Sequence, residues 1–166
     1  MPLDDRKEIF VVVDSDDNII DYRSRYECHH DKNLIHRAAD IVLFNDKGNI
    51  LMQKRSTRKD TFPLFYTISA SGHVGKGESY EEAAYRELLE EIGIKTKLEF
   101  KGTFLSSIPR ETEMAAVFVG KYDESDFVLD EDEVESVAFF SIDEIINMIE
   151  KLTPGCINTL KYMKIL

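Results

Sequence analysis

The chain has 166 residues, of which 43% are hydrophobic and 32% are charged, and its formal net charge is −11. This length and balance predict one globular domain over residues 1–166, and no apolar run approaches the roughly 20 residues that a membrane helix needs. The negative charge argues against binding to nucleic acids, because neutralising phosphates requires a basic face. With no apolar leader at the N-terminus and two cysteines outside any paired motif, we expect a cytoplasmic protein with reduced thiols.

The chain alternates between segments with the patterns of strands and of helices. Runs of apolar and β-branched residues between turn residues predict strands at 8–14, 18–24, 39–45, 49–55, 67–70, 95–108, 114–122 and 134–141, with 95–108 as one long strand or two short ones. Helices are predicted at 80–92, 142–152 and 157–166. The pattern is that of a mixed α/β protein with an N-terminal hairpin at 8–24, a core at 36–152 and a C-terminal helix at 157–166.

The predicted helix at 80–92 carries the most informative residues. A capping box at 79–82 starts it, and Gly93 supplies a residue without a Cβ where it ends. The helix has glutamates at positions i, i+3 and i+4, namely Glu87, Glu90 and Glu91. Their three carboxylates lie on one face and repel one another. Oxygen ligands of this kind suit Mg²⁺ or Mn²⁺. The apolar residues expected to face the core are Ala84, Tyr85, Leu88, Leu89 and Ile92.

Residues 72–94 follow a spaced pattern of glycine, glutamate, an arginine–glutamate pair, two further glutamates and a second glycine. The constrained positions are filled by Gly72, Glu78, Arg86, Glu87, Leu88, Glu90, Glu91, Gly93 and Ile94. This stretch resembles the Nudix box at every constrained position, which implies an α/β/α sandwich with a mixed β-sheet. The resemblance also implies a metal-dependent pyrophosphohydrolase that cleaves the phosphoanhydride bond of a nucleoside diphosphate, or of another diphosphate linked to a further group.

The resemblance implies roles for individual residues. The groups implied to hold Mg²⁺ or Mn²⁺ are the side chains of Glu87, Glu90 and Glu91 and the backbone carbonyl of Ser71. Glu78 and Arg86 would orient these catalytic groups, and the glycine loop that begins at Gly72 would let the backbone approach the substrate closely. The general base is either a box glutamate such as Glu87 or a carboxylate from a distant loop, and both alternatives stay open.

Residues 8–145 also resemble the Nudix branch that contains type 1 isopentenyl-diphosphate isomerases and their hydrolase relatives. Those isomerases hold a metal with three histidines and two glutamates. The residues of this chain that match them in order and spacing are His29, His36, His73, Glu111 and Glu113. Imidazoles combined with carboxylates suit Zn²⁺, Mn²⁺ or Fe²⁺, so the match implies a second divalent metal such as Zn²⁺. In the same branch, basic residues at the positions of Arg55 and Lys59 contact the diphosphate.

Three differences from the isomerases favour the hydrolase interpretation. Ser71 stands where the isomerases carry a cysteine, and its hydroxyl lacks the acidity of a thiol. Glu87 and Glu90 stand where those enzymes have an arginine and a non-acidic residue, and the chain has no tryptophan. An isomerase-like enzyme is the alternative. A catalytically silent ligand-sensing module is the second alternative, although such modules usually lose metal-binding glutamates of the box.

Ordinary structural interpretations apply to parts of this set. Any one of the three histidines alone would more often be a hydrogen-bonded polar residue than a metal ligand. The acidic segment 123–135 is predicted to be a solvated loop with no chemistry. The predicted partner is a small diphosphate compound, and no motif specifies an oligomeric state.

Overall fold

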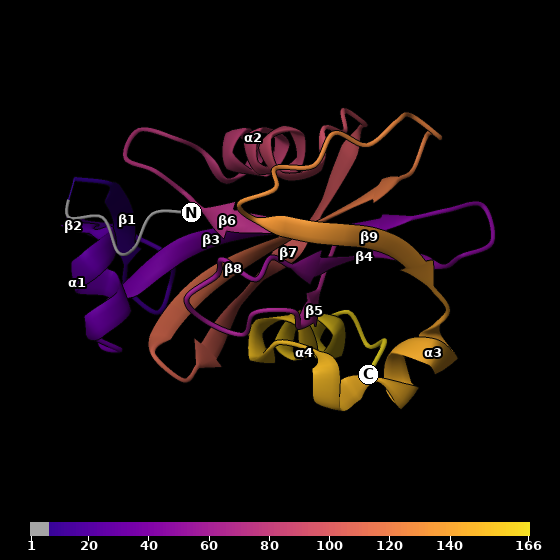
Figure 1. Cartoon of the computed structure of the whole chain (residues 1–166). Helices are drawn as coiled ribbons and strands as arrows, with labels where there is room; N and C mark the ends of the chain where they lie inside the picture. Colours follow the sequence, from indigo (N-terminus) through magenta and orange to yellow (C-terminus); the bar gives the residue numbers. More distant parts are fainter. Residues whose placement is uncertain (1–6) are drawn as a thin grey trace.

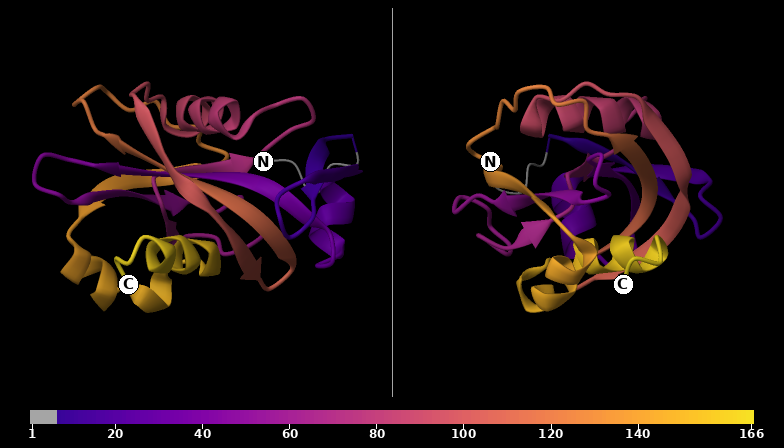
Figure 2. Two further views of the ribbon diagram at one scale, coloured as in Figure 1. Left: turned by 180° about the vertical axis from the view of Figure 1, so that it is seen from behind. Right: turned by 90° about the vertical axis from the view of Figure 1, so that its right-hand side faces the viewer.

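The computed structural model describes residues 7–166 and contains a mixed β-sheet between two helical layers (Figure 1). Helix α2 (Tyr80–Ile92) covers one face of the sheet, and α3 (Ile142–Asn147) and α4 (Pro154–Tyr162) cover the other. Viewed from the side, the sheet is strongly curved (Figure 2). The predicted α/β/α sandwich with a mixed sheet is confirmed. The prediction of one domain over 1–166 includes residues 1–6, which lie outside the described residues.

Strand β3 (Ile35–Phe44) is the centre of the sheet. It pairs with three antiparallel strands, which are β1 (Ile9–Val13), β4 (Ile50–Arg55) and β6 (Ala70–His73). It also pairs in parallel with β8 (Glu111–Lys121), whose other neighbour is β7 (Leu98–Ile108). Strand β2 (Ile19–Ser24) pairs with β1. Strands β5 (Tyr66–Thr67) and β9 (Val134–Phe140) both pair with β4.

The two faces of β3 have different surroundings. Ala39 and Ile41 pack with the buried residues of α2, whereas Val42 packs with those of α3 and α4. Because successive side chains of a strand point to opposite faces, His36 and Asp40 lie on the same face as Val42. The alternation in β3 therefore places these two polar residues on the side of the sheet that α4 covers.

The predicted N-terminal hairpin is present as β1 and β2, and it leads into a helix that was not predicted. This helix, α1 (Arg25–His30), has six residues. It begins at a capping box in which the Ser24 side chain accepts a hydrogen bond from the backbone of Glu27 and the Glu27 side chain bonds back to the backbone of Ser24. The Ser-x-x-Glu signal was in the sequence, but the helix is too short to show an apolar stripe.

Several predicted strands differ from the structure in their bounds or number. β3 and β8 begin at Ile35 and Glu111, before the predicted 39 and 114. The single strand expected at 67–70 is instead two short strands, β5 and β6, separated by Ile68 and Ser69. The Ser69 hydroxyl accepts a hydrogen bond from the backbone N–H of Leu43 at 2.8 Å and donates to the carbonyl of Leu51 at 2.6 Å. It thereby joins β3 to β4 where these strands diverge. The segment 95–108 forms one long strand, β7, rather than two.

Helix α2 has the predicted bounds. Its capping box at Ser79 is formed, and Gly93 ends it in the left-handed conformation with a φ of 74°. The predicted core residues Ala84, Leu88 and Ile92 are buried. Leu89 is a correction, because its 44% exposure places it on the solvent side. The buried stripe instead includes Ala83 and Glu91, since it is centred on Leu88 and Leu89 lies about 100° further round the helix.

The C-terminal helices also differ from their predicted bounds. The predicted helix at 142–152 is α3 followed by a short 3₁₀ segment, Ile149–Lys151, because Met148 leaves the helical conformation with a φ of −110°. The predicted helix at 157–166 begins earlier, at Pro154, and ends at Tyr162. Thr153 caps α4 by accepting from the backbone N–H of Cys156, and proline is well suited to the first turn, where its missing N–H has no partner to lose.

The acidic segment is a loop with mostly exposed acidic side chains, as predicted, but it is anchored to the rest of the fold. The backbone N–H groups of Val128 and Asp130 donate, each at 3.0 Å, to the last carbonyls of α2, and Phe127 and Leu129 pack against the core. Its apolar residues hold it at the end of α2. Cys28 and Cys156 are both free and buried, in agreement with the expected thiols. Among residues 7–166, no helix has the length and apolarity needed to cross a membrane.

Candidate functional site

The carboxylates of the box take different positions around α2. Glu87 lies directly over Gly72 of β6, and Glu91 is buried, with its Oε1 accepting a hydrogen bond from Nε2 of Gln53 at 2.7 Å. Burial and the neighbouring Glu87 together raise the pKa of Glu91 well above its usual value. Glu90 differs, because its side chain is 57% exposed. Two of the three predicted metal-binding glutamates therefore lie inside the structure and the third lies at its surface.

Arg86 joins four groups of the box. Its guanidinium donates to both oxygens of Glu78 at 2.7 and 2.9 Å, to Glu87 at 2.6 Å and to the exposed Glu90 at 3.3 Å. It also donates to the backbone carbonyl of His73 at 3.0 Å. Burial would raise the pKa of Glu78, but the bonds from Arg86 outweigh it and the net effect lowers this pKa. These bonds hold Glu78, Glu87 and Arg86 together, and the orienting role of Glu78 and Arg86 stays a prediction.

The close approach of Glu87 to Gly72 gives a testable prediction. A Cβ on Gly72 would overlap the carboxylate carbon of Glu87. Gly72→Ala is therefore expected to move this carboxylate and to lower kcat by about 10², on the scale of losing one electrostatic stabiliser, without unfolding the protein. Gly75→Ala is the matched control, because its Cβ would meet only ordinary contacts, 3.8 Å from Glu78 and 4.0 Å from Ile9. Equal activity of the two variants in a steady-state assay would contradict the prediction.

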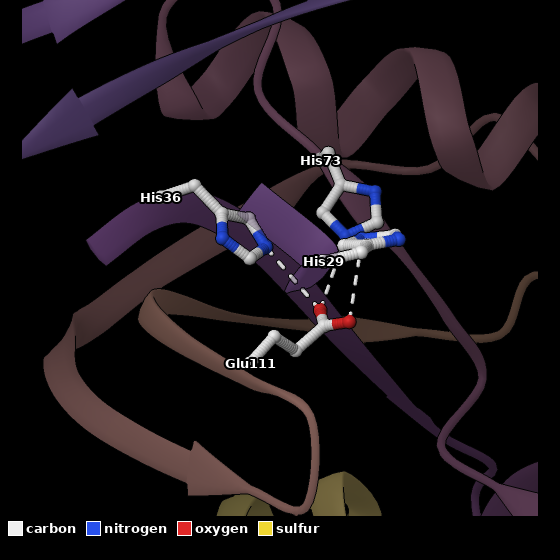
Figure 3. A group of neighbouring side chains, drawn as sticks. All are labelled: His29, His36, His73 and Glu111. Carbon is white, nitrogen blue, oxygen red and sulfur yellow. Dashed lines mark ion pairs between the residues drawn. The ribbon is translucent and has the colours of Figure 1, made fainter. Parts of the chain in front are cut away.

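The predicted histidines and glutamates meet in a second cluster, built from four elements. Figure 3 shows His29 from α1, His36 from β3, His73 from β6 and Glu111 from β8. Glu113 also belongs to β8. Potential ligand atoms of the three histidines and Glu111 all lie within 4.8 Å of one another. Oxygens of Glu111 lie 3.3, 3.2 and 3.5 Å from Nε2 of His29, His36 and His73. Glu113 lies 3.5 Å from Nε2 of both His36 and His73.

This donor set fits a divalent metal. The His36 side chain is fully buried, and within residues 7–166 neither ring nitrogen makes a well-aligned hydrogen bond, since Nε2 has only its 3.2 and 3.5 Å ion-pair contacts with Glu111 and Glu113. A buried polar atom without a hydrogen bond costs about 1–3 kcal/mol, so this imidazole is suited to a ligand that approaches from the cluster. Imidazole nitrogens and carboxylate oxygens are the donors that Zn²⁺, Mn²⁺ and Fe²⁺ accept. Phe10 lies against the rings of His29, His36 and His73, at centroid distances of 5.8, 5.3 and 4.3 Å.

The charges inside the cluster are strongly coupled. Burial opposes protonation of His73, but the carboxylates of Glu111 and Glu113 outweigh it and raise its pKa to about 9. In return, the histidines overcome the effect of burial and hold the pKa of both carboxyl groups below the usual range. The glutamates are thus held as carboxylates, which is the form that binds a cation.

One cavity of about 230 Å³ connects the box to the histidine cluster. The predicted site residues that line it are Arg55, Lys59, Ser71, Gly72, Glu87, Glu91, His29, His73, Glu111 and Glu113. Four other predicted site residues do not line this cavity. They are Glu78, Arg86, Glu90 and His36. Residues far apart in the sequence thus form a continuous site with carboxylates, imidazoles and basic groups.

The basic side of this cavity is held in place by its own contacts. Arg55 donates to the carbonyl of Thr61 at 2.8 Å, and burial lowers the pKa of its guanidinium. Lys59 forms an ion pair with Glu133, which also lines the cavity. The backbone carbonyl of Glu133 accepts from the N–H of Ser56 at 3.0 Å, so the acidic segment is joined to the basic loop.

Five further charged residues line the cavity and were not predicted as site residues. They are Arg25, Asp40, Asp60, Arg110 and Glu133. Arg25 begins the unpredicted helix α1, and Arg110 lies in the turn between β7 and β8. Asp40 accepts a hydrogen bond at 2.7 Å from Oγ1 of Thr159 in α4. Burial raises the pKa of Asp40 to about 7, and the Thr159 hydroxyl acts in the opposite direction.

Comparison with known proteins agrees with this fold and motif. The family model for the NUDIX domain matches residues 34–162. The crystal structure of DR0079 from Deinococcus radiodurans superposes with a TM-score of 0.79 at 20% identity, covering 92% of this chain and 96% of that chain, and it supports the fold alone. The sandwich and the box thus define a Nudix protein. The chain belongs to the NUDIX family.

Two relatives are more similar in sequence. A prenyl-diphosphate phosphatase of Methanosarcina mazei is 38% identical over 148 residues, which cover 86% of this chain and 84% of the relative. Isopentenyl-diphosphate Delta-isomerase 2 of Photorhabdus laumondii is also 38% identical, over 130 residues that cover 75% of this chain and 73% of the relative. Relatives of this chain therefore include both a phosphatase and an isomerase of diphosphate compounds.

Proposed function

We propose that this chain is a Mg²⁺- or Mn²⁺-dependent hydrolase that cleaves the phosphoanhydride bond of a small diphosphate compound. The observation that carries the proposal is the cavity in which Glu87 and Glu91 of the box lie together with Arg55 and Lys59. Carboxylates hold a hard cation, while arginine and lysine bind phosphate oxygens. The relative named as a prenyl-diphosphate phosphatase supports hydrolysis, and the net charge of −11 argues against a nucleic-acid substrate.

In this proposal, each residue of the box has a distinct task. Glu87, Glu91, Glu90 and the carbonyl of Ser71 hold the cation, which when bound neutralises phosphate charge and lowers the pKa of a water molecule. Arg86 and Glu78 hold Glu87 in position through the bonds described above. Arg55, Lys59 and the close backbone approach at Gly72 bind and orient the diphosphate. The His29, His36, His73, Glu111 and Glu113 cluster is a second metal site on the same cavity, suited to Zn²⁺.

The general base has two candidates. Glu87 belongs to the box, and its carboxylate lies over Gly72 at the cavity wall. Glu133 is the carboxylate from a distant loop, and its ion pair with Lys59 places it beside a proposed phosphate-binding group. When Lys59 turns to a phosphate, this ion pair is broken and Glu133 becomes free to accept a proton from water.

An isomerase-like activity is the second candidate function. It is favoured by the complete cluster of three histidines and two glutamates and by the isomerase relative. Ser71 argues against it, because a hydroxyl is a weaker acid than the thiol that the isomerases use to exchange a proton with carbon. A silent sensor module is less well supported, because Glu87, Glu90 and Glu91 are all present. A cytoplasmic location stays a prediction.

The experiment that tests the proposal is a mass-spectrometric screen of purified protein with Mg²⁺ or Mn²⁺. The panel contains nucleoside diphosphates, dinucleotides, nucleotide sugars and isopentenyl diphosphate. We expect at least one compound to release phosphate or a nucleoside monophosphate, and we expect EDTA to abolish the release. Turnover that is the same with EDTA, or its absence across the panel, would contradict a metal-dependent hydrolase.

Metal binding at the box also predicts a change in stability. A ligand at ten times its Kd stabilises a protein by about 1.4 kcal/mol, which for this size raises Tm by roughly 3–6 °C. We expect Mg²⁺ to produce such a rise, and we expect Glu87→Gln to reduce it because one metal ligand is lost. Glu81→Gln is the matched control, since Glu81 is exposed on the same helix. A wild-type Tm that does not change with Mg²⁺ concentration would contradict the site.

A further inference from the structure

Asp40 is a buried acidic residue for which hydrolysis provides no task. It follows His36 by four residues on β3, and a strand rises about 3.3 Å per residue, so it lies roughly 13 Å along the strand from His36, where its partner in β6 is Ser71. Its side chain lines the cavity although the residue is only 8% exposed. Oδ2 accepts from Oγ1 of Thr159 at 2.7 Å, and within residues 7–166 no other group donates a hydrogen bond to this carboxyl group. An acceptor oxygen therefore faces the cavity.

The surroundings of Asp40 form a polar subsite with space for a ligand. Thr67 and Thr153 line the same cavity, and their Oγ1 atoms lie 3.3 Å apart. Cys156 lines the cavity as well, and its backbone N–H donates to Oγ1 of Thr153 at 3.2 Å. Burial and the charge of Asp40 raise the pKa of its thiol. Gly155 lines the cavity too, and a Cβ on it would meet no heavy atom within 4 Å. The cavity thus continues past the diphosphate-binding residues into a region with hydroxyl groups and an unsatisfied acceptor.

We propose that Asp40 determines substrate specificity by accepting a hydrogen bond from a hydroxyl or N–H on the group joined to the diphosphate. The substrate would then be a hydroxylated or amino-bearing diphosphate rather than a purely hydrocarbon one. This inference rests on the proposed function, which places the diphosphate between the box carboxylates and the basic residues Arg55 and Lys59. The linked group then extends from there toward Asp40.

The preference follows from the cost of leaving an acceptor unsatisfied. A hydrocarbon in the subsite would exclude water from the second oxygen of Asp40 and offer no hydrogen bond in return. A substrate hydroxyl would supply that bond, and sites built to bind a hydroxyl discriminate strongly against analogues that lack it. Asp40 is thus expected to favour the hydroxylated member of a matched pair by about 5- to 150-fold, the range that corresponds to leaving one buried acceptor unsatisfied.

The test uses two probes that differ by one hydroxyl, dimethylallyl diphosphate and its 4-hydroxylated form, together with ADP-ribose. Dissociation constants are measured by calorimetry in Ca²⁺, a cation with the same preference for oxygen ligands, and kcat and KM are measured in Mg²⁺. Asp40→Asn keeps an acceptor for Thr159 but can turn an amide N–H₂ toward the cavity. Thr159→Val removes the bond to α4 and leaves the carboxylate.

We expect Asp40→Asn to weaken binding of at least one hydroxylated probe by about 10-fold or more relative to dimethylallyl diphosphate, through KM rather than kcat. Thr159→Val should preserve the wild-type preference. If Asp40 only fastens α4 to the sheet, both variants will change all three probes by equal factors, and that result would overturn the inference. A hydroxyl preference without Mg²⁺-dependent turnover of any compound would instead contradict the proposed hydrolase and leave the role of Asp40 intact.

Discussion

Replacing Glu91 with glutamine is expected to lower kcat by about 10² or more while the protein stays folded. The carboxylate is buried at the cavity wall, and the proposed cation depends on its charge, which an amide does not supply. Folding should be retained, because the amide oxygen can still accept the hydrogen bond that Gln53 donates to Oε1. Steady-state rates on the compound identified by the screen, with circular dichroism to confirm folding, are the measurement.

The control for this variant is Glu81→Gln, which makes the same chemical change on the exposed first turn of α2. Its kcat should equal that of the wild type. If Glu91→Gln turns over in Mg²⁺ as fast as this control, Glu91 does not hold the cation and the assignment of the box carboxylates is wrong.

The second large effect concerns the choice between hydrolase and isomerase. The wild type should not convert isopentenyl diphosphate to dimethylallyl diphosphate at a useful rate, because Ser71 lacks an acidic thiol and Glu87 is a carboxylate. Proton-exchange NMR on isopentenyl diphosphate in D₂O, with Mg²⁺ and Zn²⁺ added, measures this directly. Deuterium at carbon or dimethylallyl product from the wild type would reverse the ranking of the two functions.

Ser71→Cys extends the same experiment to the histidine cluster. A thiol at this position lines the cavity beside His73. If exchange appears only in this variant, the cluster of histidines and glutamates retains an isomerase-type metal site. If neither protein exchanges protons but hydrolysis of another compound depends on Mg²⁺, the hydrolase function stands alone.

Local signals made the box helix predictable from the sequence. A capping box begins α2, and Gly93 ends it with a positive φ, so both boundaries depend on residues adjacent in the chain. The capping box at Ser24 is equally well formed, yet the six residues of α1 show no periodic apolar face. The helix that carries the predicted ligand His29, and the place of Arg25 at the cavity, become apparent only from the fold.

Asp40 and Glu133 could not have been identified in the same way. Asp40 lies in a run typical of a buried strand, and its position depends on α4, which supplies Thr159 from 119 residues away. Glu133 lies in a segment whose composition predicts a solvated loop. It is held at the cavity by Lys59, 74 residues earlier, and by a backbone bond to the same basic loop. Both residues depend on contacts that no local pattern encodes.

The most direct test of the proposed chemistry is hydrolysis in H₂¹⁸O, followed by mass spectrometry of both products. Attack of water on phosphorus, with cleavage of the phosphoanhydride bond, places one ¹⁸O in one of the two phosphorus-containing products. We predict this labelling in the presence of Mg²⁺ and none with EDTA. Label in the alcohol of the linked group, with unlabelled diphosphate released, would show cleavage of the carbon–oxygen bond and contradict phosphoanhydride hydrolysis.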